Sequence, residues 1–293
     1  MQNSFGDLSR LIGRIFAFIG GETGLLIMVF AVMFCWKKEV GQRLALILAT
    51  VNAYLPMIKA AVLRPRPYIE YPDRVEAQAL VDSDTSAQDV AAQGYSFPSM
   101  HSASVPASYI TLAHSAKKKW LWILAICLTF LVGVFRVAVG MHYPTDVLAG
   151  WVFGFAVIGI FSLLDRLVEK EWIRHLILLV LALPGLFFVR TQDYFISLGM
   201  LIGLCVALPF EKKYVGFQDT RNVFAMIFRM VGAFAIYFVM NTLLKMPFRS
   251  EYLASTRLDA FLIRTLRYAV IIFVIMGVYP KIFPLFEKLK RDN

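Results

Sequence analysis

Cysteine is rare in this chain. Its three copies, Cys35, Cys127 and Cys205, lie far apart and inside apolar runs. An odd number of thiols in such places argues against a disulfide framework and against a cysteine-based metal site. We expect each of them to act as a small buried apolar side chain.

Acidic residues are also scarce, with 20 Asp and Glu against 30 Lys and Arg, which gives a formal net charge of +10. In a soluble protein this excess would suggest a nucleic-acid partner. Here the basic residues cluster in short loops between apolar runs, a pattern typical of membrane proteins. The charge therefore predicts an orientation in a bilayer and no nucleic-acid partner.

Apolar residues, in contrast, are abundant. They make up 59% of the 293 residues, and the mean hydropathy is +0.65. Ordinary soluble domains contain about 45–50% apolar residues, and a soluble domain of this length could not bury the surplus. We therefore expect lipid to cover part of the protein.

Nine apolar segments are each close to the roughly 20 residues that a bilayer-spanning helix requires. They cover about residues 21–36, 42–63, 100–116, 120–139, 146–165, 173–190, 193–210, 222–244 and 262–280. The prediction is an all-α integral membrane protein, with a six-helix core in residues 1–190 and a three-helix extension in residues 191–293. An amphipathic helix is expected over residues 4–20, at the membrane interface.

The basic loops predict the orientation of these spans. With nine spans, one side of the membrane carries most of the cations: Lys37, Lys38, Arg43, Lys117, Lys118, Lys119, Arg166, Lys170, Arg174, Lys212, Lys213, Arg221, Lys281, Lys288, Lys290 and Arg291. Basic loops favour the cytoplasm, which places the C-terminus there and the three motifs below on the opposite face. Short loops without an Asn-x-Ser/Thr acceptor fit a bacterial inner membrane.

Residues 68–94 form the one long polar loop, with six acidic residues and one basic residue. Two interpretations are open. The loop is either a solvated lid or a surface that favours an amine close to a substrate phosphate.

The first polar motif runs from Lys59 to Pro67. Lys59 and Arg66 are seven residues apart, which puts them on one face of a helix. Pro65 and Pro67 should end that helix, so that Arg64 and Arg66 lie near the membrane surface. Arginine offers phosphate oxygens a fork of donors, and lysine offers a point charge. The alternative is that these cations only snorkel from a helix end.

The second motif is Pro98–His101. Pro98 should open a turn into a helix, whose first backbone amides attract anions. Ser99 adds a hydroxyl, Met100 a backbone amide, and His101 an imidazole within reach of a bound group. The alternative is a serine N-cap followed by an incidental histidine.

The third motif begins with Arg136 at the end of one span. His142 follows just before the next span, and Asp146 lies four residues further on, so one helical turn can bring its carboxylate to the imidazole. A carboxylate on one ring nitrogen fixes the tautomer and makes the other nitrogen a better nucleophile. Pro144, Thr145 and Asp146 would also suit helix capping, which does not exclude catalysis.

These three motifs resemble those of the type 2 phosphatidic acid phosphatase superfamily, whose pattern is Lys-x6-Arg-Pro, Pro-Ser-Gly-His and Ser-Arg-x5-His-x3-Asp. The spacing inside each motif is intact, and the similarity covers about residues 20–190. The matching residues are Lys59, Arg66, Pro67, Pro98, Ser99, His101, Arg136, His142 and Asp146. The sequences around the second and third motifs, and the extra spans, are weakly similar to the sphingosine-phosphate phosphatase and glucose-6-phosphatase branches.

The resemblance implies a role for each residue. His142 would be the nucleophile that forms a phosphohistidine, and Asp146 would orient it. His101 would protonate the leaving group and then activate water. Lys59, Arg66, Arg136, Ser99 and the Met100 amide would bind the phosphate, with Arg64 as an accessory candidate, and no metal or other cofactor is implied.

Two positions depart from the family pattern. Met100 replaces the glycine, which would strain the backbone if this residue needs a positive φ but costs nothing in the first turn of a helix. Phe135 replaces the serine before Arg136, so that one wall of the site becomes apolar. Both changes bear on substrate range more than on activity.

The leading prediction is an enzyme, a metal-independent phosphatase that hydrolyses a lipid phosphate or diphosphate from within the membrane. Three alternatives remain open: a phosphotransferase with another lipid or sugar acceptor, a phosphatase for a soluble sugar phosphate, and an anion transporter. The particular substrate and the oligomeric state are left undetermined.

Overall fold

The computed structural model describes residues 13, 15–75 and 94–288 of the chain. These residues form helices joined by short turns, and no strand occurs among them. The all-α prediction is therefore confirmed. Most of the helix predicted over residues 4–20 lies outside the described residues, although residues 15–20 are helical.

Seven helices of the described chain are long and apolar enough to cross a membrane. They are Lys38–Glu70, Lys119–Ala138, Pro144–Leu167, Glu171–Phe188, Gln192–Tyr214, Val223–Leu243 and Leu258–Glu287, where the first, fourth and last join helices that follow one another closely. The two other predicted spans correspond to a shorter apolar helix, Glu22–Trp36, and to a helix of 17 residues, Met100–Ala116. The protein is an integral membrane protein, while the count of nine spans stays a prediction.

The chain divides into two compact units. The first contains the described residues of Met1–Leu25 together with Tyr54–Leu167 and Gly185–Thr191, and the second contains Leu26–Ala53, Val168–Pro184 and the described residues of Gln192–Asn293. Helices α2 (Glu22–Ala31) and α3 (Lys38–Val62) contribute to both units. The predicted division of the chain near residue 190 stays a prediction.

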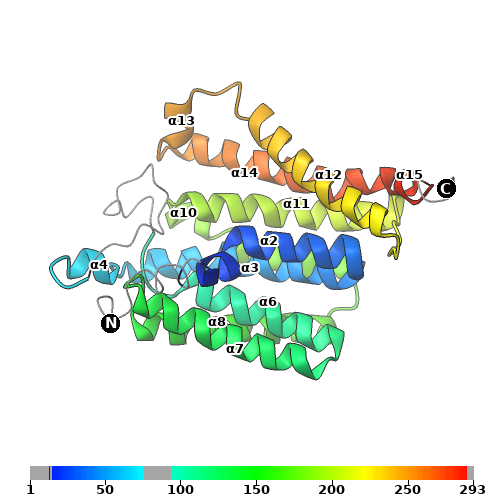
Figure 1. The fold of residues 1–293 in the computed structure, drawn as a ribbon. Coiled ribbons are helices and arrows are strands. Elements are labelled where there is room, and N and C mark those ends of the chain that lie inside the picture. The colour runs from blue at the N-terminus through cyan, green and yellow to red at the C-terminus, as the bar shows by residue number, and fades with distance from the viewer. Residues whose placement is uncertain (1–12, 14, 76–93, 289–293) are drawn as a thin grey trace. The chain divides into compact units, whose positions relative to one another are not determined.

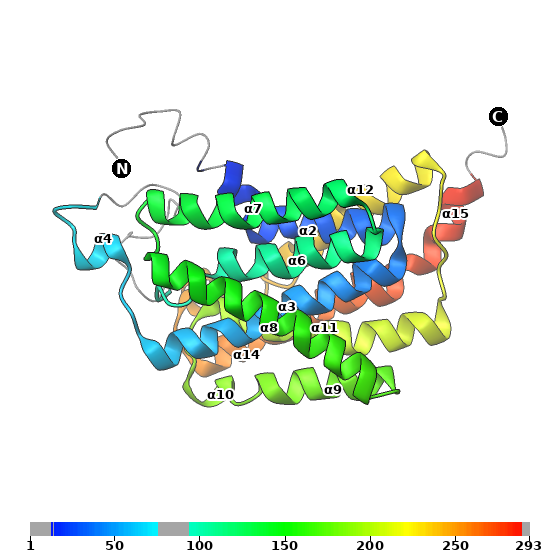
Figure 2. The same ribbon diagram turned by 90° about the horizontal axis from the view of Figure 1, so that it is seen from below.

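Three helices form the centre of the first unit, as Figures 1 and 2 show: α6 (Met100–Ala116) packs against both α7 (Lys119–Ala138) and α8 (Pro144–Leu167). Small side chains on α6 allow this close packing. Those that are buried include Ser102, Ala103, Ser104, Ala107 and Ser108. The short helices α4 (Pro67–Glu70) and α10 (Gly185–Phe188) complete the unit.

Two glycines of α8 bring its backbone against α6. A Cβ atom added to Gly150 would lie 2.6 Å from the Ser99 carbonyl oxygen, and one added to Gly154 would lie 2.4 Å from that of Ala103. Gly159, further along the same helix, has nothing within 4 Å of such an atom. The two tight positions therefore fix the start of α6, with Ser99 and His101, beside the start of α8.

The second unit consists mainly of the C-terminal helices, and α11 pairs closely with α14, as Figure 1 shows. A Cβ atom added to Gly199 of α11 would lie 2.3 Å from the Thr265 carbonyl oxygen of α14. The elements of this unit are η2 (Val32–Trp36), α9 (Glu171–Ala182), α11 (Gln192–Tyr214), α12 (Val223–Leu243), α13 (Ser250–Ala254), α14 (Leu258–Phe273), η3 (Val274–Val278), η4 (Tyr279–Ile282) and α15 (Phe283–Lys288).

All three cysteines are free thiols, as predicted. Cys35 and Cys205 are half-buried, but Cys127 is exposed on α7, so the prediction that all three are buried is wrong at this position. Its neighbours Ile123, Ile126 and Phe130 are exposed large apolar side chains. An apolar surface on a predicted span is the surface that lipid covers, which accounts for a thiol there.

Candidate active site

The first motif ends a helix as predicted. Helix α3 stops at Val62, and Lys59 lies in its last turn. The Lys59 side chain is buried, and its Nζ atom donates a hydrogen bond to the carbonyl oxygen of Tyr95. Arg66 is also buried, and it donates from Nε to the Gly94 carbonyl oxygen at 3.0 Å and from Nη1 to that of Met141 at 3.4 Å.

Each residue of the segment Gly94–Ser96 is therefore hydrogen bonded to a residue of the first motif. Besides the bonds from Arg66 and Lys59, the Ser96 amide donates to the Arg64 carbonyl oxygen at 2.8 Å. Gly94 has a φ of +66°, which glycine adopts without strain. These contacts place the residues just before the second motif beside the cations of the first.

The second motif begins α6. Ser99 is the N-cap, and its hydroxyl oxygen accepts from the Ser102 amide at 3.4 Å and from the Ser102 hydroxyl at 2.9 Å. Met100 is the first residue of the helix and has no positive φ. Methionine therefore replaces the glycine of the family pattern without backbone strain.

His101 faces the helical residues near the N-terminus. Its ring is hydrogen bonded to the backbone carbonyl of Ala17. A Cβ atom on Gly21 would lie 3.6 Å from its Nε2 atom, an ordinary van der Waals distance, so the ring lies against this helical segment. Beside it, Phe135 stacks on Phe16 with ring centroids 4.8 Å apart, and the apolar wall predicted at Phe135 is packed against this N-terminal helix.

The third motif spans the turn between α7 and α8. Arg136 lies in the last turn of α7 and is buried, and its Nε atom has no hydrogen-bond partner among the residues that the structure describes. His142 is 3% exposed and Asp146, in the first turn of α8, is 0% exposed. The two residues, which were predicted to pair, lie close together in an ion-pair contact, with His142 Nδ1 and Asp146 Oδ2 3.5 Å apart.

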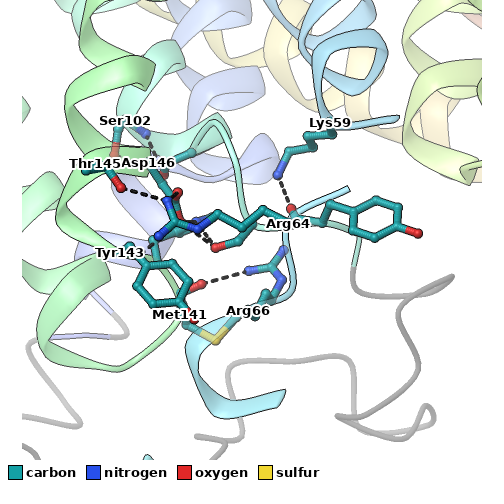
Figure 3. Close-up of polar contacts among 12 residues, drawn as sticks. Lys59, Arg64, Arg66, Ser102, Met141, Tyr143, Thr145 and Asp146 are labelled. Atoms are coloured by element: carbon teal, nitrogen blue, oxygen red, sulfur yellow. Dashed lines mark hydrogen bonds and ion pairs between the residues drawn. The ribbon is translucent and has the colours of Figure 1, made fainter. Parts of the chain in front are cut away.

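Arg64 contacts the same carboxylate. Figure 3 shows its guanidinium group between Asp146 and the ring of Tyr143. Its Nη1 atom donates to Asp146 Oδ1 at 2.9 Å and to the Thr145 hydroxyl at 2.7 Å, and its Cζ atom lies 3.8 Å from the Tyr143 ring centroid. The accessory candidate is thus an ion-pair partner of Asp146.

Several contacts of this site involve residues that the sequence did not single out. The Ser96 hydroxyl donates to Asp146 Oδ2 at 2.5 Å, and the Tyr143 amide donates to the same oxygen at 2.9 Å. The Tyr143 hydroxyl donates to Glu70, the first acidic residue of the polar loop. Burial, followed by this bond to the Glu70 carboxylate, raises the pKa of Tyr143. No spacing rule connects Ser96 with Asp146, which lies fifty residues further along the chain.

Most of the polar loop, including Glu76, Asp82, Asp84 and Asp89, lies outside the described residues. The two interpretations of this loop are therefore both still open.

Within residues 13, 15–75 and 94–288, no group of three or more His, Cys, Asp or Glu side chains is placed to hold a metal ion.

Charge and burial act together on His142. Burial lowers the pKa of its imidazole well below the usual value of 6.5, and the positive charges of Arg66, Arg136 and Lys59 lower it further, in that order. The ring is therefore neutral at pH 7, with an unprotonated nitrogen available. The three cations come from the first and third motifs and act on one imidazole.

Comparison with known proteins identifies the family. Residues 40–169 match the model of the PAP2 superfamily, and residues 195–291 match the transmembrane extension of PAP2 superfamily phosphatases. Together the two matches cover more than half of the chain. The chain belongs to the PAP2 superfamily, as the resemblance in its three motifs predicts.

Two relatives share shorter stretches with the chain. An undecaprenyl-diphosphatase of Sulfolobus acidocaldarius is 47% identical over 60 residues, which are 20% of this chain and 29% of that protein. A phosphatidylglycerophosphatase B of Bacillus subtilis is 32% identical over 85 residues, which are 26% of this chain and 42% of that protein. The chain thus spans less than half the length of either relative, and no solved structure matches it significantly.

Proposed function

We propose that the protein is a membrane phosphatase that hydrolyses a lipid phosphate or diphosphate through a phosphohistidine on His142, without a metal ion. The observation that carries this proposal is the charge around His142: a buried, neutral imidazole acted on by Lys59, Arg66 and Arg136. Such a site attracts a phosphate dianion and at the same time holds a nucleophile. Membership of the PAP2 superfamily supports the same activity.

In the first chemical step, the lone pair of His142 Nε2 attacks phosphorus. The Nε2–P bond forms while the bond from phosphorus to the leaving oxygen breaks, and His101 gives its proton to that oxygen. Nε2 is the reacting atom because Nδ1 faces Asp146 and Ser96. In the second step His101 takes a proton from water, the new hydroxide attacks phosphorus, and the Nε2–P bond breaks to release phosphate.

The remaining residues bind the phosphate. Lys59, Arg66 and Arg136 neutralise the charge on its oxygens, most strongly in the transition state. The Ser99 hydroxyl oxygen accepts from Ser102, which leaves its own proton to donate to a phosphate oxygen. The Met100 amide, in the first turn of α6, is among the helix amides without an intrahelical partner.

The substrate proposed is a phosphate or diphosphate ester whose lipid tail stays in the bilayer. The names of the two relatives support this class, since one is a prenyl-lipid diphosphatase and the other a phospholipid phosphatase. The exposed apolar surface of the spans supports it as well, because such a surface lies in the bilayer that holds the lipid tail.

The test is phosphate release by detergent-purified protein in the presence of EDTA. The panel contains undecaprenyl diphosphate, phosphatidylglycerol phosphate, phosphatidic acid, sphingosine phosphate and glucose 6-phosphate. We expect undiminished release with EDTA from at least one lipid and little from glucose 6-phosphate. Release that EDTA abolishes would contradict the metal-independent mechanism, and release from none of the lipids would contradict the function.

The site is proposed to face away from the cytoplasm, in a bacterial inner membrane with the C-terminus inside. The basic residues of alternate loops support this orientation. In a cysteine-free background, Asp73→Cys in the exposed turn after α4 should react with an impermeant maleimide added to intact cells. Lys118→Cys, in the exposed turn before α7, should react only after the membrane is opened, and the reverse pattern would invert the topology.

A further inference from the structure

Two groups approach Nδ1 of His142, and both contacts are long. Asp146 Oδ2 is 3.5 Å away, in an ion-pair contact, and the Ser96 hydroxyl is 3.4 Å away, in a long hydrogen bond. The carboxylate is also strongly held elsewhere, since Arg64, Tyr143 and Ser96 all donate to it. A direct bond would require the carboxylate to leave some of these partners.

The Ser96 hydroxyl lies between the two groups. Its oxygen is 2.5 Å from Asp146 Oδ2 and 3.4 Å from His142 Nδ1, and the residue is completely buried. A hydroxyl has one proton to donate and lone pairs to accept with. The short contact to the carboxylate takes the proton of Ser96, so that its oxygen presents a lone pair toward His142 Nδ1.

The backbone around Ser96 keeps this hydroxyl in place. The Ser96 amide donates to the Arg64 carbonyl oxygen, and the side chain of Arg64 binds the other oxygen of Asp146. In addition, the Ser96 carbonyl oxygen accepts a hydrogen bond from the His142 ring. Arg64 and Ser96 therefore hold one carboxylate from two sides, and only Ser96 also contacts the imidazole.

We propose that Ser96 is a positioning residue that connects Asp146 to His142. Its hydroxyl donates to Asp146 Oδ2, and its hydroxyl and carbonyl oxygens share the proton on His142 Nδ1, which keeps the ring proton on Nδ1 and the lone pair on Nε2. This inference rests on the proposed function, in which Nε2 is the nucleophile. It adds to the family pattern a residue that lies outside all three motifs.

The role of Ser96 in the reaction follows from charge. When the Nε2–P bond forms and the bond to the leaving oxygen breaks, the imidazole ring becomes cationic while Nδ1 keeps its proton. The polarised hydroxyl transmits the negative charge of Asp146 to that ring without moving a proton. The effect is larger in the transition state than in the bound substrate, so it acts on kcat more than on KM.

The first test compares Ser96→Ala with Ser96→Thr. Alanine removes the hydroxyl and leaves the backbone contacts. We therefore expect kcat to fall roughly 10- to 100-fold, as when a group that orients a metal-binding side chain is removed, with KM nearly unchanged. Threonine keeps a hydroxyl and should restore most of kcat. The control is Ser108→Ala, which removes another fully buried hydroxyl, on α6, that donates to the Ser104 carbonyl and belongs to no part of the site.

A second measurement does not depend on turnover. The protein has four histidines, and 15N spectra of histidine-labelled protein, with His142→Ala to assign the signal, report which nitrogen carries the proton. We expect the Nδ1–H tautomer of His142 in the wild type and in Ser96→Thr, and a mixture of tautomers in Ser96→Ala.

The outcomes separate this inference from the proposed function. Wild-type kcat in Ser96→Ala, or an unchanged tautomer in that variant, would overturn the role of Ser96 while phosphatase activity stands. A uniform loss in Ser96→Ala and Ser96→Thr with lowered thermal stability would also overturn it, because it indicates a structural role only. If the wild type releases no phosphate, the function fails, and the spectra still decide whether Ser96 sets the tautomer.

Discussion

Replacing His142 with alanine is expected to reduce phosphate release by more than about a thousandfold, to the background of the assay, because the reaction loses its nucleophile. The variant should still fold, since alanine removes one small ring from a turn that four backbone hydrogen bonds to Arg136 and Tyr143 support. The measurement is turnover of the preferred lipid, together with acid-labile phosphate trapped on the protein by rapid quenching. Only the wild type should carry the trapped phosphate.

The control for this variant is Lys118→Ala, which replaces an exposed lysine before α7 and should keep wild-type turnover and thermal stability. Substantial turnover in His142→Ala would exclude the phosphohistidine mechanism.

The lowered pKa of His142 also predicts how the activity of the wild type depends on pH. Protonation of this ring should reduce kcat/KM only below the usual pKa of 6.5.

Replacing His101 with alanine is expected to have a second large effect that depends on the leaving group. An alkoxide leaving group needs a proton, so we expect a loss of roughly 10²- to 10⁴-fold for a lipid phosphate. The leaving group of p-nitrophenyl phosphate is stable as an anion. With this substrate, the rate of phosphohistidine formation should therefore fall far less. The measurement is the rate of that first step for both substrates by rapid quenching.

His114 provides a matched control for this variant. It lies on the same helix, is exposed, and contacts the Trp122 ring rather than the site. His114→Ala should therefore leave both rates within about twofold of the wild type, since surface substitutions of this kind are usually close to neutral. Equal losses for both substrates in His101→Ala would show that His101 is not the acid that protonates the leaving group.

The surroundings of the site also explain how the protein tolerates its departures from the family pattern. Met100 occupies the first turn of α6, where any residue fits, and its amide is still available to an anion. Phe135 stacks on Phe16, so the apolar wall is part of a helix contact instead of an open surface. Both substitutions are therefore compatible with the chemistry proposed at His142 and His101.

Much of the architecture followed from the sequence, because the cause is local. A helix that spans a bilayer needs a long apolar run, and the predicted segment 120–139 nearly coincides with Lys119–Ala138. The end of α3 followed from Pro65 and Pro67, which cannot continue a helix. The pairing of His142 with Asp146 followed from their spacing of one helical turn, although the spacing did not predict a gap of 3.5 Å.

The sequence by itself therefore determined the membrane class, seven of the nine predicted spans and the three motifs, since these depend on composition and on residues close together in the chain. Only the tertiary structure decided how the motifs meet. Gly150 and Gly154 bring α8 against α6, and the Gly94–Ser96 segment is bound to Arg64 and Arg66, which places Ser96 and Arg64 on Asp146. The hydrogen bonds among these contacts join residues 28 to 82 positions apart. They form because a buried carboxylate must find donors wherever packing supplies them.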